Sequence, residues 1–166
     1  MSLIDTHCHL DFDAYDADRD AVLERAAAAD VTRLIIPAVD LETSQASLRL
    51  SAQYPGTVYG TVGVHPNSTA DFNTETVEAL RGLASSSTQV VAVGEIGLDY
   101  HWDTSPKAAQ RAAFEAQLAL AAELGLPVII HNRDASEDVL VILESWVTTL
   151  PPALKALPGV LHSFSA

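Results

Sequence analysis

Short apolar runs rich in β-branched residues alternate along the whole chain with longer stretches of helical character. Most of these runs are apolar at consecutive positions, which is typical of parallel strands buried on both faces. Strands and helices that alternate in this way indicate βα units joined by right-handed crossovers. The predicted strands cover residues 3–5, 33–39, 58–64, 90–95, 128–131 and 160–162.

The predicted strands begin about 31 residues apart on average, a spacing that suits regular βα units. Six units form either an open doubly wound sheet or most of an eight-stranded barrel, and eight units at this spacing have about 250 residues. The chain has 166 residues, which predicts a single domain over residues 1–166. Only four residues follow the last predicted strand, so we expect it to lack its covering helix.

Two helix starts and one helix end carry local signals. Ser105 and Pro106 predict an N-cap followed by proline at the first helical position. Residues 134–137 have the spacing of a capping box with Asp134 as the cap. The helix after Pro106 is expected to stop at Gly125. It places four apolar residues on one face, namely Phe114, Leu118, Ala121 and Ala122.

The chain is strongly acidic, with 22 Asp and Glu against 9 Lys and Arg and a formal charge of −13. This balance excludes a fold-wide basic surface for nucleic acid, so a phosphate ligand would need a metal ion or a few placed side chains. Cys8 is the only cysteine, which excludes a disulfide framework and a cysteine-rich zinc module. We identify no signal peptide and no apolar stretch of the ~20 residues that span a membrane, so we expect a soluble, cytoplasmic chain.

His7 and His9 form the first chemical signal. On a strand, residues i and i+2 project to the same side, so both imidazoles can reach one ion while Cys8 points away as a small buried residue. Imidazole is the commonest metal ligand that needs no thiolate. An isolated pair of this kind is weak evidence, because two polar residues at a strand end are also common.

Other ligand-type side chains share this placement at strand ends. His65, Glu95, His131 and His162 each end an apolar run. In parallel βα folds, ligands bind at the carboxyl ends of the strands. Each residue alone would more often be a structural polar group or a helix cap. Together with the first histidine pair they predict one shared metal site.

Loop residues near these strand ends are further candidates. His101 is a candidate for substrate contact, whereas Asp99 and Arg133 follow closely on two of the strand-end residues and can line the same mouth. The alternatives are that Asp99 is a surface acid in a loop and that Arg133 is a solvated base. An acidic segment near the N-terminus lacks the glycine and glutamate of a calcium loop, which favours a solvated helix start. Its acids are Asp11, Asp13, Asp16, Asp18 and Asp20.

Five motifs occur in order along the chain: LIDTHCHLD, GVHP, VAVGEIGLDY, PVIIHNRDA and LHSFS. Together they resemble the TatD family of metal-dependent deoxyribonucleases, within the amidohydrolase superfamily. The resemblance covers essentially the whole chain and implies an α/β fold, a (β/α)₈ TIM barrel with a one- or two-metal hydrolytic site. It implies that His7 and His9 bind a first ion, that Glu95 bridges, that His131 and His162 bind a second, and that His65, Asp99 and Arg133 lie near the substrate phosphate.

The family has a further metal-binding Asp at the end of the eighth strand, and no matching motif occurs here. We therefore expect this chain to hold about six of the eight units, with its first and sixth strands left as open edges. The expected activity is that of a TatD-type deoxyribonuclease or phosphodiesterase that cleaves DNA ends through metal-activated water.

The resemblance and the ligand set leave several choices open. Mg²⁺, Mn²⁺ and Zn²⁺ all suit mixed imidazole and carboxylate ligands. DNA or short single-stranded nucleic acid is the expected partner, with no membrane and no obligate protein partner. The alternatives are a related hydrolase of an amide or ester, since the same cluster polarises a carbonyl, and an inactive fragment that only binds metal.

Overall fold

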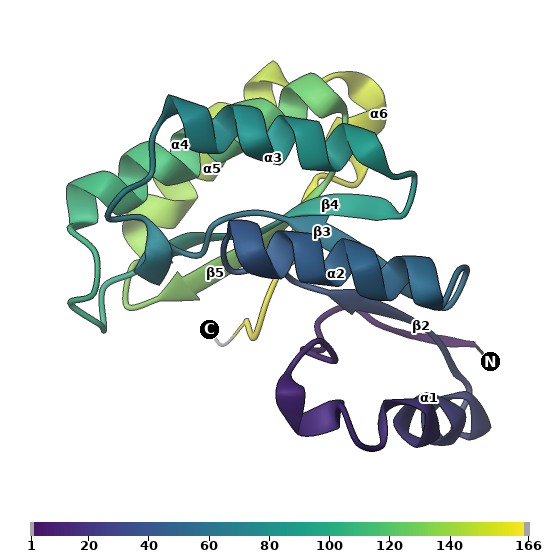
Figure 1. The fold of residues 1–166 in the computed structure, drawn as a ribbon. Helices are drawn as coiled ribbons and strands as arrows, with labels where there is room; N and C mark the ends of the chain where they lie inside the picture. The colour runs from purple at the N-terminus through teal and green to yellow at the C-terminus, as the bar shows by residue number, and fades with distance from the viewer. Residues whose placement is uncertain (1, 165–166) are drawn as a thin grey trace.

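In the computed structural model, which describes residues 2–164, six parallel strands form one sheet in the order of the sequence (Figure 1). The sequence predicted all six strands and their parallel pairing, and both are confirmed. The strands are β1 (Leu3–Asp5), β2 (Val31–Ile36), β3 (Val58–Val62), β4 (Val90–Asp99), β5 (Val128–Arg133) and β6 (Gly159–Leu161).

The largest difference from the predicted strands is in β4, which runs four residues beyond Glu95. Its second half pairs with β5, from Ile96 opposite Ile130 to Asp99 opposite Arg133. Gly97 and Asp99 interrupt the apolar run in this half, so pairing with a neighbour extends the strand. The extension matters because it carries Glu95 and Asp99 on one continuous strand.

Helices follow most of the strands, and Figure 1 shows α3, α4 and α5 packed together on one side of the sheet. Short 3₁₀ turns cover Asp13–Tyr15 and Pro66–Ser68. The helices are α1 (Arg19–Ala28), α2 (Leu41–Gln53), α3 (Thr74–Ser86), α4 (Lys107–Leu124), α5 (Ser136–Thr149) and α6 (Pro152–Ala156).

Both predicted helix starts are wrong in detail. Pro106 is the N-cap of α4 rather than its first helical residue, and the Ser105 hydroxyl accepts the backbone N–H of Thr69 at 3.2 Å. Ala135 is the N-cap of α5, while the Asp134 carboxylate lies 3.1 Å from a ring nitrogen of His101. In each case the side chain bonds a group distant in sequence instead of a backbone N–H in the first turn of the helix.

The predicted apolar face and end of α4 are confirmed. Phe114, Leu118 and Ala121 are buried, while Ala122 is half-buried. Gly125 ends the helix in the left-handed conformation with φ of 67°, which costs glycine little. This face packs with α5 against β4 and β5 and forms the largest part of the core.

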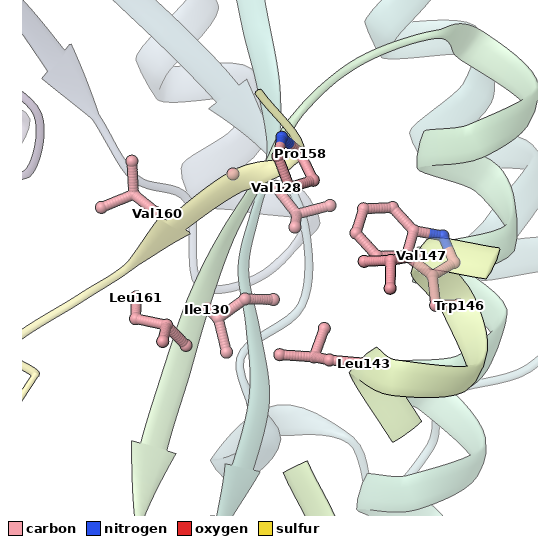
Figure 2. A pocket seen from close by; sticks show the side chains of 9 residues that line it. Val128, Ile130, Leu143, Trp146, Val147, Pro158, Val160 and Leu161 are labelled. Atoms are coloured by element: carbon pink, nitrogen blue, oxygen red, sulfur yellow. The ribbon is translucent and has the colours of Figure 1, made fainter. Parts of the chain in front are cut away.

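The two edge strands leave apolar side chains partly exposed. Leu3 and Ile4 of β1 are each 50% exposed, and Val160 and Leu161 of β6 are 44% and 39% exposed. Within the described residues each of these strands has one neighbour, as expected. A groove of about 200 Å³ lies between α5 and the β5–β6 edge (Figure 2). Its lining is almost wholly apolar and includes Trp146, Leu143, Ile130 and Leu161.

No helix among residues 2–164 combines the length and the apolar character needed to cross a membrane.

Candidate metal centre

Histidine and carboxylate side chains from five strands gather at the carboxyl end of the sheet. Two overlapping groups of three have ligand atoms within 4.8 Å of one another, and Glu95 belongs to both. One group adds His7 and His9, which follow β1, and the other adds His65, which follows β3, and His131 of β5. The structure therefore brings the predicted strand-end residues together at one place.

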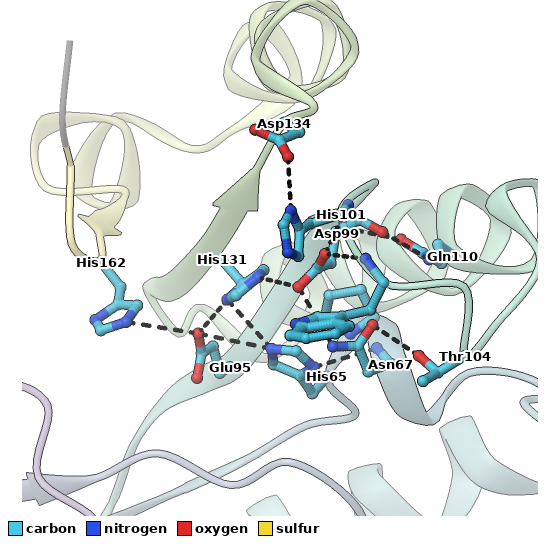
Figure 3. Close-up of polar contacts among 12 residues, drawn as sticks. His65, Asn67, Glu95, Asp99, His101, Thr104, Gln110, His131, Asp134 and His162 are labelled. Carbon is cyan, nitrogen blue, oxygen red and sulfur yellow. Dashed lines mark hydrogen bonds and ion pairs between the residues drawn. The ribbon is translucent and has the colours of Figure 1, made fainter.

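Glu95 lies at the centre of the cluster (Figure 3). It is 4% exposed, and its Oε1 accepts a hydrogen bond from Nδ1 of His131 at 2.8 Å. Nε2 of His7 lies 3.5 Å from the other carboxylate oxygen. Nε2 of His65 and Nε2 of His162 each lie 4.0 Å from Oε1. One buried carboxylate thus faces imidazoles from four other strand ends.

Two glycines allow Glu95 to approach His131 so closely. A Cβ atom on Gly97, whose φ is 146°, would collide with the carbonyl oxygen of His131. A Cβ on Gly94 would lie 2.7 Å from Cβ of Ile129. Both positions therefore require glycine for close contact between β4 and β5. Residues 94–97 (GEIG) of the sequence motif therefore allow Glu95 to lie beside β5.

The titration of His7 and Glu95 suits metal ligands. Burial lowers the pKa of His7 to about 4, and it lowers the pKa of His65 to about 4. Burial acts to raise the pKa of Glu95, but the hydrogen bond from His131 and the nearby His65 outweigh it, so this pKa lies below its usual value. Neutral imidazole and ionised carboxylate are the forms that bind divalent ions.

Two buried ring nitrogens support the fit to a metal ion. Nδ1 of His7 and Nδ1 of His9 are buried without a hydrogen-bond partner among the described residues. A buried polar atom without a partner costs about 1–3 kcal/mol, so such atoms usually mark a missing ligand or water. The donor set of imidazoles and one shared carboxylate suits Zn²⁺, Mn²⁺ and Mg²⁺.

His131 lies between two carboxylates. Its Nδ1 faces Glu95, and its Nε2 donates to Oδ2 of Asp99 at 3.0 Å. Burial lowers the pKa of His131, but its hydrogen bonds to the two acids outweigh this, so the net shift is upward. A metal-binding histidine commonly donates its second N–H to a carboxylate, which orients the ring. Asp99 has this relation to His131.

Asp99 itself is 1% exposed and does not lie open at the mouth of the site. Its Oδ1 accepts the backbone N–H groups of His101 at 3.0 Å and Trp102 at 3.1 Å. Burial acts to raise its pKa, but these hydrogen bonds and the one from His131 outweigh burial, so its pKa lies below its usual value. Such a carboxylate positions its neighbours rather than facing solvent.

Arg133 and His101 lie at the rim of the cluster. Both are exposed, and the Arg133 guanidinium lies 5.4 Å from the ring centre of Trp102. His101 pairs with Asp134 instead of reaching Glu95 (Figure 3). The structure thus separates these two candidates from the central imidazoles.

His65 carries a further constraint in its hydrogen bonding. Its Nδ1 accepts the backbone N–H of Asn67 at 3.1 Å, so Nδ1 holds a lone pair. The proton of the neutral ring is therefore on Nε2, the atom that faces Glu95 and His131. In this tautomer His65 offers the centre an N–H donor and not a ligand lone pair.

Two buried glutamines of α4 were not predicted as site residues. Gln110 accepts the backbone N–H of Asp99 at 2.9 Å and donates to its carbonyl at 3.0 Å. Gln117 accepts the N–H of Val64 at 2.7 Å and donates to its carbonyl at 3.1 Å. The available signal was two glutamines seven residues apart, on the otherwise apolar face of a predicted helix.

The remaining sequence candidates lie outside the cluster. Cys8 is half-buried among apolar residues, and burial raises its pKa to about 12, as expected for a small packed residue. Four of the five acids near the N-terminus are exposed before or within α1, which agrees with a solvated helix start, whereas Asp11 is half-buried. Ser165, the last residue of the LHSFS motif, lies outside the described residues.

A family model described as TatD related DNase matches residues 4–166. The chain belongs to this family. The resemblance drawn from the five motifs is thereby confirmed, and so is the fold class, since the curled parallel sheet and its helices form part of a (β/α) barrel.

Curated relatives from two bacteria match almost the whole chain. The chain is 42% identical over 163 residues to "3'-5' ssDNA/RNA exonuclease TatD" of Erwinia tasmaniensis and 41% identical over 163 residues to "Uncharacterized metal-dependent hydrolase YabD" of Bacillus subtilis. These matches cover 98% of this chain but only 60% and 61% of the relatives. The chain therefore spans about 60% of the length of these family members.

Solved structures agree with the family assignment. The TatD homolog YjjV of Escherichia coli K12 superimposes with a TM-score of 0.86 at 34% identity, over 99% of this chain and 61% of that one. A TatD family hydrolase of Entamoeba histolytica gives a TM-score of 0.86 at 26% identity, over 100% of this chain and 59% of that one. Family members from bacteria and from a eukaryote thus share this arrangement of strands and helices.

Proposed function

We propose that this chain carries the metal-binding part of a hydrolase that removes nucleotides from the 3' end of single-stranded DNA or RNA. The observation that supports it is the buried carboxylate of Glu95, which faces imidazoles from four other strand ends. The name of the exonuclease relative from Erwinia tasmaniensis supplies the substrate class.

His7, His9 and Glu95 would hold one divalent ion, and Glu95, His131 and His162 a second, drawn from Mg²⁺, Mn²⁺ or Zn²⁺. When bound, a pair of such ions lowers the pKa of water and stabilises the charge on the oxygens of a phosphodiester during displacement. The cations also give local positive charge on a chain whose formal charge is −13. The lone thiol of Cys8 supports a reducing location such as the cytoplasm.

Other side chains would act on the substrate or on the ligands. His65 directs its Nε2–H toward the centre and would donate it to a phosphate oxygen, a role that its hydrogen bond with Asn67 supports. Asp99 would hold the ring of His131 in place through Nε2. Arg133 at the rim would pair with a phosphate, since guanidinium matches phosphate geometry.

A nuclease assay tests the proposal directly. We expect the chain to shorten a single-stranded oligonucleotide labelled at its 5' end one nucleotide at a time, in Mg²⁺ or Mn²⁺, and to stop when EDTA is added. Because it has no match to the family's Asp after the eighth strand, we expect it to act far more slowly than a full-length family member. Glu95→Gln should remove at least 99% of the rate, about 2.7 kcal/mol of transition-state stabilisation. Hydrolysis of a panel of amides and lactones with no cleavage of the oligonucleotide would contradict the proposal.

A further inference from the structure

The loop after β4 places an exposed tryptophan beside the candidate metal centre. The chain has two tryptophans. Trp146 is 8% exposed and donates its indole N–H to the carbonyl of Leu118 at 2.8 Å, so it is part of the core. Trp102 is 52% exposed. Trp102 is therefore the tryptophan whose ring a ligand at the centre can reach.

Asp99 fixes the position of Trp102 relative to the centre. One oxygen of its carboxylate accepts the backbone N–H of Trp102, and the other contacts Nε2 of His131 at 3.0 Å. His131 in turn donates to Glu95 at 2.8 Å. Three hydrogen bonds thus connect the backbone of Trp102 to the central carboxylate. The loop backbone that carries the ring is thus hydrogen-bonded to side chains of the centre.

A cation lies over the same ring. The guanidinium carbon of Arg133 is 5.4 Å from the centre of the Trp102 ring, and the imidazole of His101 meets the ring edge-on at 4.8 Å between centres. Arg133 follows His131 by two residues on β5, so it comes from the strand that also supplies a ligand. An aromatic face and a guanidinium placed together suit a nucleotide, because one part can stack on a base and the other can pair with a phosphate.

We propose that Trp102 is a stacking platform for an unpaired nucleobase, and that with Arg133 it forms a subsite for the terminal nucleotides of a single strand. This inference rests on the proposed nuclease function and adds to it the group that selects unpaired ends. The acidic chain provides no general attraction for nucleic acid, so affinity must come from a few such local contacts. A base inside a duplex has both faces covered by its neighbours and has no face free for the indole.

The two tryptophans allow a direct test. In the variant Trp146→Phe, Trp102 is the only source of tryptophan fluorescence. We expect a phosphorothioate oligothymidylate, which resists hydrolysis, to quench this fluorescence, and a blunt duplex of the same length to quench it far less. Quenching by both ligands to the same extent, or by neither, would overturn the subsite.

Substitutions measure the contribution of the ring. Trp102→Ala should weaken oligothymidylate binding about five- to 160-fold, the range for removal of one base–aromatic stack, whereas Trp102→Phe should retain most of the affinity. Leu140→Ala, at a side chain that is 55% exposed on α5, is the matched control and should bind normally. Equal affinity of the Trp102→Ala and Leu140→Ala variants would overturn the proposal.

The outcome for the subsite is separate from the outcome for hydrolysis. If Trp102→Ala weakens oligothymidylate binding while the unsubstituted chain does not cleave an oligonucleotide, the subsite stands and the nuclease proposal fails. If the chain cleaves single strands and Trp102→Ala leaves both the affinity and KM unchanged, the nuclease proposal stands and the subsite fails.

Discussion

The imidazole rings of His7 and His162 stack on each other, with their centres 3.5 Å apart and their planes at 16°. These two residues follow β1 and β6, the opposite edges of the sheet. In a flat sheet of six strands, five steps of about 4.8 Å would separate the edges by about 24 Å. The stacking therefore requires a sheet that curls until its two edges approach each other at the carboxyl end.

This curvature adds His162 to the imidazoles that Glu95 faces, and the first prediction tests its role. We expect His162→Ala to weaken Mn²⁺ or Zn²⁺ binding at least tenfold in a calorimetric titration, because it removes one imidazole nitrogen near Glu95. His162→Phe keeps an aromatic ring against His7 but has no nitrogen, and it should lose as much affinity as the alanine variant. His101→Ala is the control, since that ring pairs with Asp134 at the rim, and it should bind normally. Normal binding by His162→Phe would reduce the role of His162 to packing.

His65 is expected to behave in the opposite way. Its Nδ1 accepts the Asn67 N–H, so its Nε2 presents a donor to the centre. His65→Ala should therefore leave metal affinity within about threefold while lowering kcat about a hundredfold or more, the usual effect of losing one transition-state donor. The measurements are a metal titration and a single-stranded nuclease assay on the same preparation. A loss of metal affinity comparable with that of His162→Ala would identify His65 as a ligand instead.

The sequence predicted the strands and the gathering of the site residues for one physical reason. Consecutive apolar residues identify strands buried on both faces, and all parallel strands of one sheet end on the same side. His7, Glu95 and His131 could therefore be placed together without any knowledge of distances. The pattern carries this information because it depends on chain direction and burial, which are both properties of the local sequence.

Features that depend on partners distant in sequence were not predictable in this way. Ser105 and Asp134 have the composition of helix caps, but Thr69 and His101 take their side chains. The burial of Asp99 was not predicted either, because His131 of β5 and Gln110 of α4, which are distant in sequence, are among its partners. A polar residue in an amphipathic pattern shows only that it lies near the core, and not which backbone group it satisfies.

Gln110 and Gln117 give the third prediction. Each uses its amide to satisfy both backbone groups of a residue at the site: Gln110 bonds Asp99, and Gln117 bonds Val64, which precedes His65. Replacing either by Leu leaves a buried N–H and C=O without partners, so we expect the free energy of unfolding to fall by about 1–3 kcal/mol. We also expect about tenfold weaker metal binding for Gln110→Leu, because Asp99 orients His131.

The matched control for these variants is Gln89→Leu. Gln89 also donates its amide to a backbone carbonyl, that of Ser51 at 2.8 Å, but it precedes the first residue of β4 at the opposite end of the sheet. It should lower stability in a denaturant titration without changing metal affinity. If all three variants change stability and metal affinity in the same proportion, the glutamines of α4 have only a structural role.

The last prediction separates two glycines that the sequence alone does not distinguish. Gly97 has φ of 146°, and a Cβ atom there would collide with the backbone of His131. Gly82 lies inside α3 with no heavy atom within 4 Å of an added Cβ. Gly97→Ala should therefore push β4 away from β5 and weaken metal binding. It should also lower the free energy of unfolding by about 3 kcal/mol or more, because strain at such a backbone position costs about 1–3 kcal/mol before the collision is added. Gly82→Ala should raise stability by about 0.5–1 kcal/mol, because alanine favours the helix interior. Thermal and denaturant unfolding of both variants, with a metal titration of each, would measure these effects. A Gly97→Ala variant with normal stability and normal metal binding would show that close contact between β4 and β5 is not what places Glu95.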